Sequence, residues 1–140
     1  MVTSPKLAFA GIVINSLDPD SLASFYTSLL GWERRMDEVD WIALQHSDGG
    51  TAIAFQRSAD AIPPRWPTQP GSQQMSHHLD FTTSDLDGAI HHALRCGAKL
   101  SAVQSVEDER ILIDPAGNPF CLIRSAGAEG EQDDVTPTAR

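Results

Sequence analysis

The chain has 140 residues, of which 41% are hydrophobic and two are cysteine, and its formal net charge at pH 7 is −9. This length indicates one domain with a substantial core, and the negative charge argues against nucleic acid, which proteins bind through clustered Lys and Arg. Because the sequence has no apolar run of the roughly 18 residues that span a membrane, no signal-peptide pattern and no disulfide framework, we expect a cytoplasmic protein without a membrane partner.

The first half of the chain predicts a strand, a helix and three further strands. Residues 6–15 form an alternating segment that is typical of a strand. Asp18 is a suitable helix N-cap, Pro19 suits the first helical position, and Gly31 ends the helix. Three short extended segments follow, at residues 32–36, 41–46 and 51–57.

The second half predicts the same elements in the same order. A strand at residues 75–83 precedes a helix that starts with Ser84 as its N-cap and ends at Gly97. Three extended segments again follow, at residues 99–102, 110–114 and 119–124.

The two halves are therefore read as a repeat. A shift of 67 residues places Gly11 on His78 and Asp18 on Asp85. We predict two β-α-β-β-β modules, at about residues 7–57 and 75–124, joined by a proline-rich linker at 58–74. The acidic segment 125–140 has no apolar periodicity and predicts a disordered tail.

Alternation along the strand "MSHHLDFTT" separates its side chains into two sets. Leu79 and Phe81 share one face and are suited to pack beneath the helices, whereas His78 and Asp80 share the other. These two polar residues form either a satisfied polar pair on the strand or part of the lining of a binding site.

Three stretches resemble the vicinal oxygen chelate superfamily, the group of glyoxalase I, fosfomycin and bleomycin resistance proteins and extradiol dioxygenases. They are "LDPDSLASFYTSLLGWE", "HLDFTTSDLDGAI" and above all "DPAGNPFCLI". The pair "IAFQR" and "PPRWP" is similar to the glyoxalase-like branch. The resemblance implies an α+β fold for one domain at 1–124, in which the two modules form a curved, cup-shaped mixed sheet with the helices outside. It also implies a homodimer.

In metal-dependent members of the superfamily, the first and last strands of each module supply the ligands. The resemblance assigns these positions to His78 and Cys121 in the second module, and to Gly11 and either Ala54 or Gln56 in the first. Gly11 has no side chain and Cys121 replaces a glutamate, so we expect no metal centre and no cofactor. A divalent metal, if bound, would be held by His78, Gln56 and Cys121.

Other residues are candidates for a ligand-binding surface in the cup. Trp66 and Arg65 lie in "PPRWP" and offer an aromatic plane and a positive charge as a rim over the cup. Alternatively, Trp66 only caps the core or packs against a partner subunit. Trp41, Gln56 and Cys121 complete the candidate set, although a free cysteine is often only a buried apolar residue.

Two functions of different classes remain open at this level, besides a third possibility that the fold serves mainly as a dimer-forming structural unit. The cup could bind a small organic molecule without the usual metal centre. Alternatively, the chain is a metal-dependent or histidine-based lyase, isomerase or dioxygenase, with His78 as its acid–base group.

Overall fold

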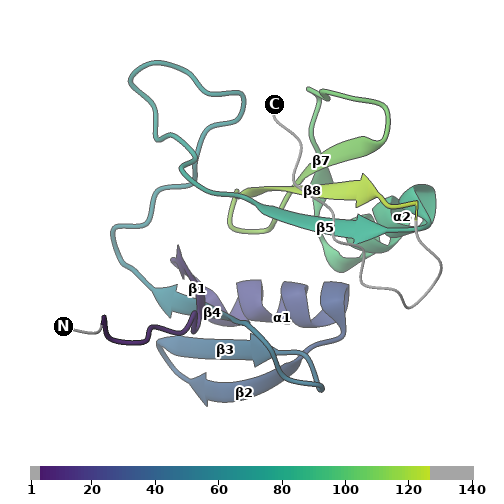
Figure 1. Cartoon of the computed structure of the whole chain (residues 1–140). Coiled ribbons are helices and arrows are strands. Elements are labelled where there is room, and N and C mark those ends of the chain that lie inside the picture. The colour runs from purple at the N-terminus through teal and green to yellow at the C-terminus, as the bar shows by residue number, and fades with distance from the viewer. Residues whose placement is uncertain (1–3, 127–140) are drawn as a thin grey trace. The chain divides into compact units, whose positions relative to one another are not determined.

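The computed structural model describes residues 4–126 and divides into two compact units, Met1–Asp60 and Ala61–Arg140 (Figure 1). Each unit contains one helix and one four-stranded sheet, in the order β-α-β-β-β. The predicted α+β class and its two modules are confirmed, while the single domain over 1–124 stays a prediction. Most of the proline-rich linker belongs to the second unit, and the predicted tail lies outside the described residues from 127 on.

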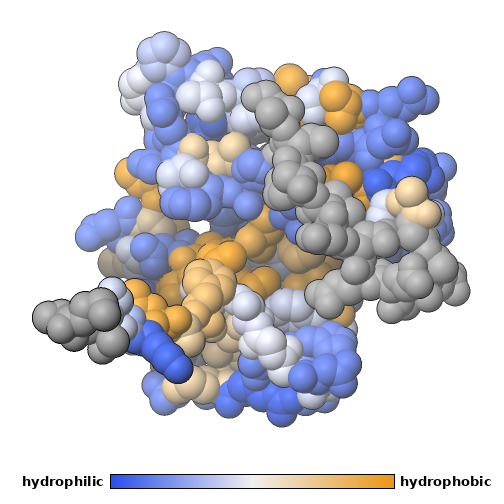
Figure 2. All heavy atoms as spheres, in the orientation of Figure 1, coloured by the Kyte–Doolittle hydropathy of each residue, from blue (hydrophilic) through white to orange (hydrophobic). Residues whose placement is uncertain are grey.

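In the first module, the first and last strands pair in parallel. The elements are β1 (Gly11–Ser16), α1 (Pro19–Leu30), β2 (Glu33–Glu38), β3 (Trp41–Gln45) and β4 (Ala52–Arg57). The sheet has the order β1-β4-β3-β2, with β1 parallel to β4 and the other neighbours antiparallel. Two apolar residues of the segment before β1, Leu7 and Phe9, are exposed, and Figure 2 shows that apolar side chains reach the surface of the molecule.

Helix α1 begins and ends where the sequence predicts. The Asp18 carboxylate accepts a hydrogen bond from the backbone N–H of Ser21 at 3.1 Å, and Gly31 closes the helix in the left-handed region at φ 71°. The helix packs on the sheet through Tyr26, whose ring stacks on Phe55 of β4 at a centroid distance of 5.5 Å. The core of this module therefore lies between α1 and one face of the sheet.

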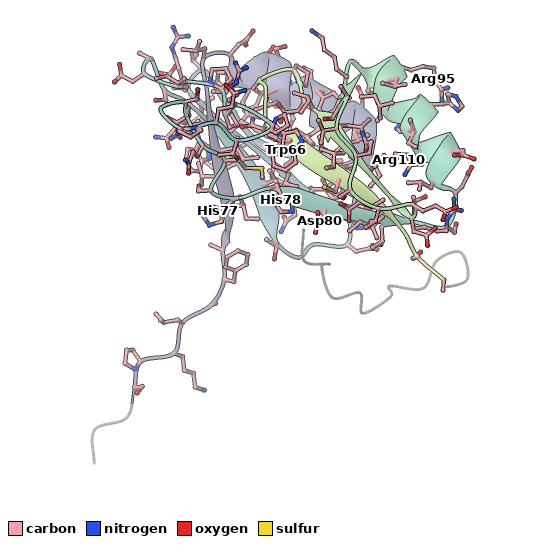
Figure 3. All side chains as sticks on the ribbon, turned by 90° about the horizontal axis from the view of Figure 1, so that it is seen from above. Trp66, His77, His78, Asp80, Arg95 and Arg110 are labelled. Carbon is pink, nitrogen blue, oxygen red and sulfur yellow. The ribbon has the colours of Figure 1, made fainter. Side chains whose placement is uncertain are left out.

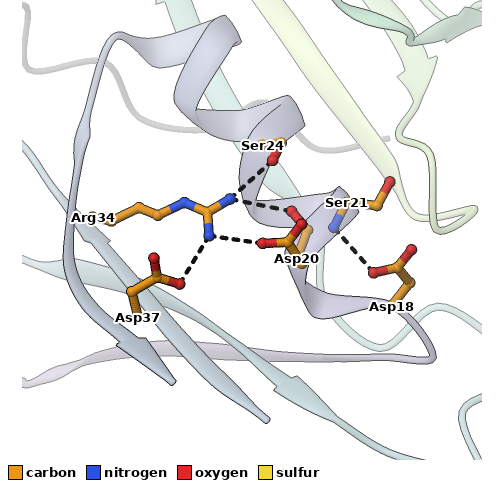
Figure 4. A network of polar contacts seen from close by, with 6 residues as sticks. All are labelled: Asp18, Asp20, Ser21, Ser24, Arg34 and Asp37. Carbon is orange, nitrogen blue, oxygen red and sulfur yellow. Dashed lines mark hydrogen bonds and ion pairs between the residues drawn. The ribbon is translucent and has the colours of Figure 1, made fainter. Parts of the chain in front are cut away.

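Arg34 ties the edge strand β2 to the first turn of α1 (Figure 4). Its guanidinium donates to the carboxylates of Asp20 at 2.9 Å and Asp37 at 3.0 Å, and to the Ser24 hydroxyl at 2.9 Å. The hydrogen bond to Asp20 is the main cause that raises the pKa of Arg34 above its usual value, against a lowering by burial. Both carboxylates are largely exposed, so the network orients the strand more than it stabilises the fold.

The second module repeats this arrangement with shorter elements. They are β5 (Leu79–Thr83), α2 (Leu86–Cys96), β6 (Lys99–Leu100), β7 (Glu109–Ile113) and β8 (Pro119–Arg124), in the sheet order β5-β8-β7-β6. The 67-residue shift holds for the parallel strands, because Ile12 pairs with Ile53 and Leu79 pairs with Phe120. Neither described helix is long and apolar enough to cross a membrane.

The prediction of Ser84 as the N-cap of α2 is wrong by one residue. Asp85 caps the helix, since its carboxylate accepts a hydrogen bond from the backbone N–H of Gly88 at 3.0 Å. The Thr83 hydroxyl accepts from the backbone N–H of Asp85 at 3.1 Å, as the Ser16 hydroxyl does for Asp18. In both modules the cap therefore consists of an aspartate and a hydroxyl residue two positions before it. The preference of serine for N-cap positions does not by itself identify this pair.

The predicted first strands also begin too early. Strand β5 starts at Leu79 rather than at residue 75, and β1 starts at Gly11 rather than at residue 6. A strand needs a hydrogen-bonded neighbour, and the neighbour of β5 is β8. Because β8 begins at Pro119, one residue before Phe120, the partner of Leu79, the residues before position 78 have no strand among the described residues to pair with. His78 therefore lies immediately before the strand.

The motif "DPAGNP" builds the turn between β7 and β8. The buried Asp114 carboxylate accepts hydrogen bonds from the backbone N–H groups of Ala116 and Asn118, both at 2.9 Å, and from the Asn118 side chain. Gly117 takes φ 92°, a conformation that other residues rarely adopt. The most specific stretch of the resemblance is thus explained by the turn that it forms.

We expect Asp114→Ala to lower the free energy of unfolding by about 2–4 kcal/mol, because it leaves several partly buried donors without their acceptor. Denaturant unfolding measures this loss. The matched control is Asp48→Ala in the turn between β3 and β4, where the side chain is 89% exposed and a change within about 0.5 kcal/mol is expected. Equal effects of the two substitutions would contradict this account of the turn.

Candidate functional site on the second module

The sheet of the second module has one side packed against α2 and a second side that carries the candidate site. Phe81 and Phe120 contact each other edge to face at 6.1 Å and lie on the α2 side. Their neighbours Asp80 and Cys121 are register partners on β5 and β8, so their side chains emerge on the opposite side. We call this side the Cys121 face; it carries Asp80, Ile111, Cys121 and Ile123.

His78 and Asp80 lie together at the start of β5 (Figure 3). Nε2 of His78 is 3.4 Å from Oδ1 of Asp80, and their side chains are 29% and 15% exposed. The adjacent His77 is not part of this pair, because its Nδ1 lies 3.0 Å from the Ser76 hydroxyl. The structure therefore brings His78 and Asp80 together, as alternation along the strand predicts.

Cys121 lies next to this pair and is almost fully buried. One ligating atom each from His78, Asp80 and Cys121 lies within 4.8 Å of the other two. The Cys121 thiol also packs with Ile111 and Ile123 in an apolar cluster. The prediction that Cys121 packs as a buried apolar residue is thus correct, but the residue also lies next to two polar side chains.

Trp66 packs against this apolar cluster from the linker. The indole Nε1 is buried and has no hydrogen-bond acceptor among residues 4–126, which is rare for a buried N–H group. Arg65 is exposed, and its backbone N–H donates to the carbonyl of Gln73 at 2.8 Å, which holds the linker together. Trp66 therefore covers part of the Cys121 face, and its indole N–H is a buried donor that no acceptor of the described residues satisfies.

Trp41 and Gln56 are register partners on β3 and β4 of the first module. The parallel register makes Ala54 the counterpart of Cys121, and Gln56 the counterpart of Ile123, two residues further along the strand. The position that the sequence left open between Ala54 and Gln56 is therefore Ala54, which has no donor atom.

Glu109 is a buried carboxylate on the side of the candidate site, and the sequence analysis did not identify it. It pairs with Ile123 across β7 and β8, so it belongs to the Cys121 side of the sheet, and it is only 1% exposed. The Ser105 hydroxyl donates a hydrogen bond to its carboxylate at 3.1 Å. The signal was present in the sequence, because Glu109 alternates with Ile111 in "ERILI", but the predicted strand began one residue later.

The family-model comparison matches a glyoxalase-like domain over residues 11–123. The chain belongs to this glyoxalase-like family of the vicinal oxygen chelate superfamily. The matched range spans both modules, so the resemblance drawn from the sequence is confirmed. No curated protein sequence matches the chain significantly.

Solved structures support the fold of this glyoxalase-like chain. A glyoxalase/bleomycin resistance protein/dioxygenase family enzyme from Burkholderia phytofirmans has a TM-score of 0.62 at 16% identity, covering 82% of this chain and 96% of that one. A mutant of the fosfomycin resistance protein of Listeria monocytogenes, complexed with Mn(II) and 1S,2S-dihydroxypropylphosphonic acid, has a TM-score of 0.61 at 12% identity, covering 87% and 91%. The bleomycin-binding protein of Streptomyces verticillus, complexed with copper(II)-bleomycin, has a TM-score of 0.54 at 18% identity, covering 87% and 99%.

The residues of this glyoxalase-like chain do not fit the metal centre that the superfamily implies. Gly11 and Ala54 occupy the two positions of the first module and offer no donor atom. A side chain cannot be added at Gly11 without moving the backbone, because its Cβ would collide with the carbonyl oxygen of Ala52. Of the four metal-ligand positions that the superfamily implies, only His78 and Cys121 carry a donor atom. Asp80, which lies beside them, is not one of these four positions.

We expect Trp66→Ala to lower the free energy of unfolding by about 2–3 kcal/mol, since the half-buried ring covers Ile111 and Ile123. Thermal melts and denaturant titration would measure this. Arg65→Ala, in the same linker segment but exposed, is the control and should change stability by no more than about 0.5 kcal/mol. A fully stable Trp66→Ala variant would show that the ring does not support the Cys121 face.

Proposed function

We propose that the chain binds a small organic molecule on the Cys121 face of its second module. The observation that carries this proposal is the buried indole N–H of Trp66, which has no acceptor among the described residues and lies against the Cys121 cluster. An unpaired buried donor costs about 1–3 kcal/mol, and a ligand oxygen that accepts its hydrogen bond would recover this energy.

The composition of the face suits such a ligand. Ile111, Ile123 and the Trp66 ring supply apolar contact area, while His78 and Asp80 supply a few fixed polar groups. Small-molecule sites in proteins typically combine a mostly apolar lining with a few polar groups that set orientation. A compact molecule with a carbonyl, carboxylate or phosphonate oxygen matches this combination, and the exposed Arg65 could add charge complementarity if that oxygen is anionic.

The missing donors of the first module favour binding over the usual metal chemistry of the superfamily. Two of the similar structures are complexes with small molecules, one with a phosphonic acid and one with bleomycin. Both proteins have folds like this one, and this supports the binding of an organic molecule by the present chain. Trp41 and Gln56 belong to the first module, and their role in ligand binding stays a prediction from the sequence.

We expect Trp66→Phe to weaken ligand binding by roughly fivefold or more, because it removes the indole donor but keeps an aromatic ring on Ile111 and Ile123. It should not lower the melting temperature, since the lost N–H has no partner in the described structure. His78→Ala should weaken the same ligand by a similar factor. Isothermal calorimetry with hits from a thermal-shift screen of small carboxylates, phosphonates and carbonyl compounds would measure both.

Trp32→Phe is the matched control for this test. Trp32 is also partly buried but lies in the first module, with its ring edge to face with His46 at 6.5 Å. Its substitution should leave affinity within about twofold. If Trp66→Phe bound every hit as tightly as the wild type and also melted higher, the donor would be only a cost to the fold and the proposal would fail.

The His78–Asp80 pair supports a second candidate, a histidine-based lyase, isomerase or dioxygenase. A carboxylate 3.4 Å from one ring nitrogen orients the imidazole, and an oriented imidazole can transfer protons at neutral pH. Each hit should therefore be incubated with the protein and recovered for mass spectrometry. Unchanged recovery supports binding alone, whereas conversion that disappears in His78→Ala supports the enzyme.

The predicted homodimer is part of the same proposal and is supported by exposed apolar residues before β1. Leu7 is 93% exposed and Phe9 72% exposed, which is unfavourable unless a second surface covers them. We expect light scattering to give twice the 15.2 kDa mass of one chain, and Leu7→Ser with Phe9→Ser to shift it toward one chain. A monomeric wild type at micromolar concentration would exclude the dimer.

A further inference from the structure

The Cys121 face combines three kinds of metal-ligating group within one module. His78 offers an imidazole nitrogen, Asp80 a carboxylate oxygen and Cys121 a thiol sulfur, each within 4.8 Å of the others. Asp80 and Cys121 are register partners on neighbouring strands, so the sheet fixes their relative position. His78 lies just before β5 and is partly exposed, which leaves its ring room to adjust.

These distances are close to those of a tetrahedral site. Nitrogen and oxygen ligands of one zinc ion lie about 3.3–3.5 Å apart, and an edge to sulfur is about 3.6 Å. The distance between Nε2 of His78 and Oδ1 of Asp80 is 3.4 Å, which is already such an edge. All three ligating atoms lie within 4.8 Å of one another, so the widest separation has to close by roughly 1.2 Å, a shift within reach of small side-chain movements.

The chemistry of the donors selects the class of ion. Thiolate and imidazole ligands favour zinc and similar borderline-soft ions, whereas Mn²⁺ and Mg²⁺ prefer oxygen ligands. One thiolate and one carboxylate neutralise a divalent cation, and a neutral complex is suited to a site where Cys121 is 2% exposed. Three protein ligands also leave one coordination position open, as in catalytic zinc sites.

We propose that His78, Asp80 and Cys121 bind a zinc-class divalent ion in the second module, with an oxygen or sulfur atom of the small molecule as the fourth ligand. The inference deepens the proposed function and rests on it for that fourth ligand. The site differs from the centre implied by the superfamily, because Asp80 supplies the third ligand and the first module needs to supply none. It also replaces the expectation, drawn from Gly11 and Cys121, that no metal binds.

Co²⁺ is the probe for this site, because its spectrum reports both ligands and geometry. Full-length chain without an affinity tag, freed of metal by a chelator, is titrated with Co²⁺ alone. We expect one equivalent to give a thiolate-to-metal charge-transfer band and the strong visible bands of tetrahedral cobalt, both lost on adding Zn²⁺. Weak octahedral bands without charge transfer, or no binding at all, would overturn the proposal.

Variants assign the ligands. Cys121→Ser should abolish the charge-transfer band, and Asp80→Asn and His78→Gln should each weaken Co²⁺ binding by at least about tenfold, the loss expected even for groups that only support a metal ligand. Asp80→Asn is nearly isosteric and partly exposed, so it tests the site even if Cys121→Ser fails to fold. Full affinity in a folded Asp80→Asn variant would overturn the inference.

The chain provides two matched controls. Cys96 is the other cysteine, and its sulfur lies 3.9 Å from both ring nitrogens of His92 on α2. His77 is the histidine adjacent to His78. Cys96→Ser and His77→Gln should leave the cobalt spectrum unchanged, and a band lost in Cys96→Ser but kept in Cys121→Ser would assign the ion to α2 and refute the proposal.

The failure of this inference can be told apart from failure of the proposed function. A small molecule that still binds with unchanged affinity in the presence of chelator, together with no cobalt spectrum, refutes the metal site and leaves the binding function standing. A tetrahedral cobalt spectrum that no screened molecule perturbs supports the ion site and argues against the binding function. A hit that shifts the visible cobalt bands supports both.

Discussion

The parallel pairing of the first and last strands is the constraint on which each module depends. It joins β1 to β4 and β5 to β8 across almost the whole length of the module, so residues about 40 positions apart become direct neighbours. Because parallel strands need a long crossover, the helix and two further strands are the connection between them. The same pairing puts Asp80 beside Cys121, and the candidate site is built around these two neighbours.

The two modules share the residues that build the repeat and differ in those that face the site. Ser16 and Thr83 each accept a hydrogen bond from the N-cap aspartate two residues later, and Gly31 and Gly97 end the two helices. These contacts fix chain direction at the points where a strand gives way to a helix. On the Cys121 face, the residues of the second module differ in chemistry from their counterparts in the first module. The counterparts of His78, Asp80 and Cys121 are Gly11, Val13 and Ala54.

Because of this difference, the candidate site residues of the described structure with reactive side chains lie on the second module. One surface of the second module's sheet carries the His78 imidazole, the Asp80 carboxylate and the Cys121 thiol. The buried Glu109 carboxylate on β7 belongs to the same side. Buried or half-buried polar groups cost energy unless they are paired, and each of these four groups has a neighbour with which it interacts. The Trp66 indole Nε1 is one of two buried side-chain atoms in the described residues that have no hydrogen-bond partner, the other being Thr27 Oγ1 on α1, and only Trp66 packs against the Cys121 cluster.

The sequence by itself determined the α+β class, the 67-residue repeat, both ends of α1 and the shared side of His78 and Asp80. All of these follow from local rules, namely the period of two in strands, the period near 3.6 in helices and the preferences of capping residues. Only the tertiary structure decided that Asp80 is beside Cys121, that Trp66 packs on the same face, and that Arg34 binds α1. Strand register and the packing of a linker depend on contacts between residues far apart in the chain, and a local pattern carries no information about which of those contacts form.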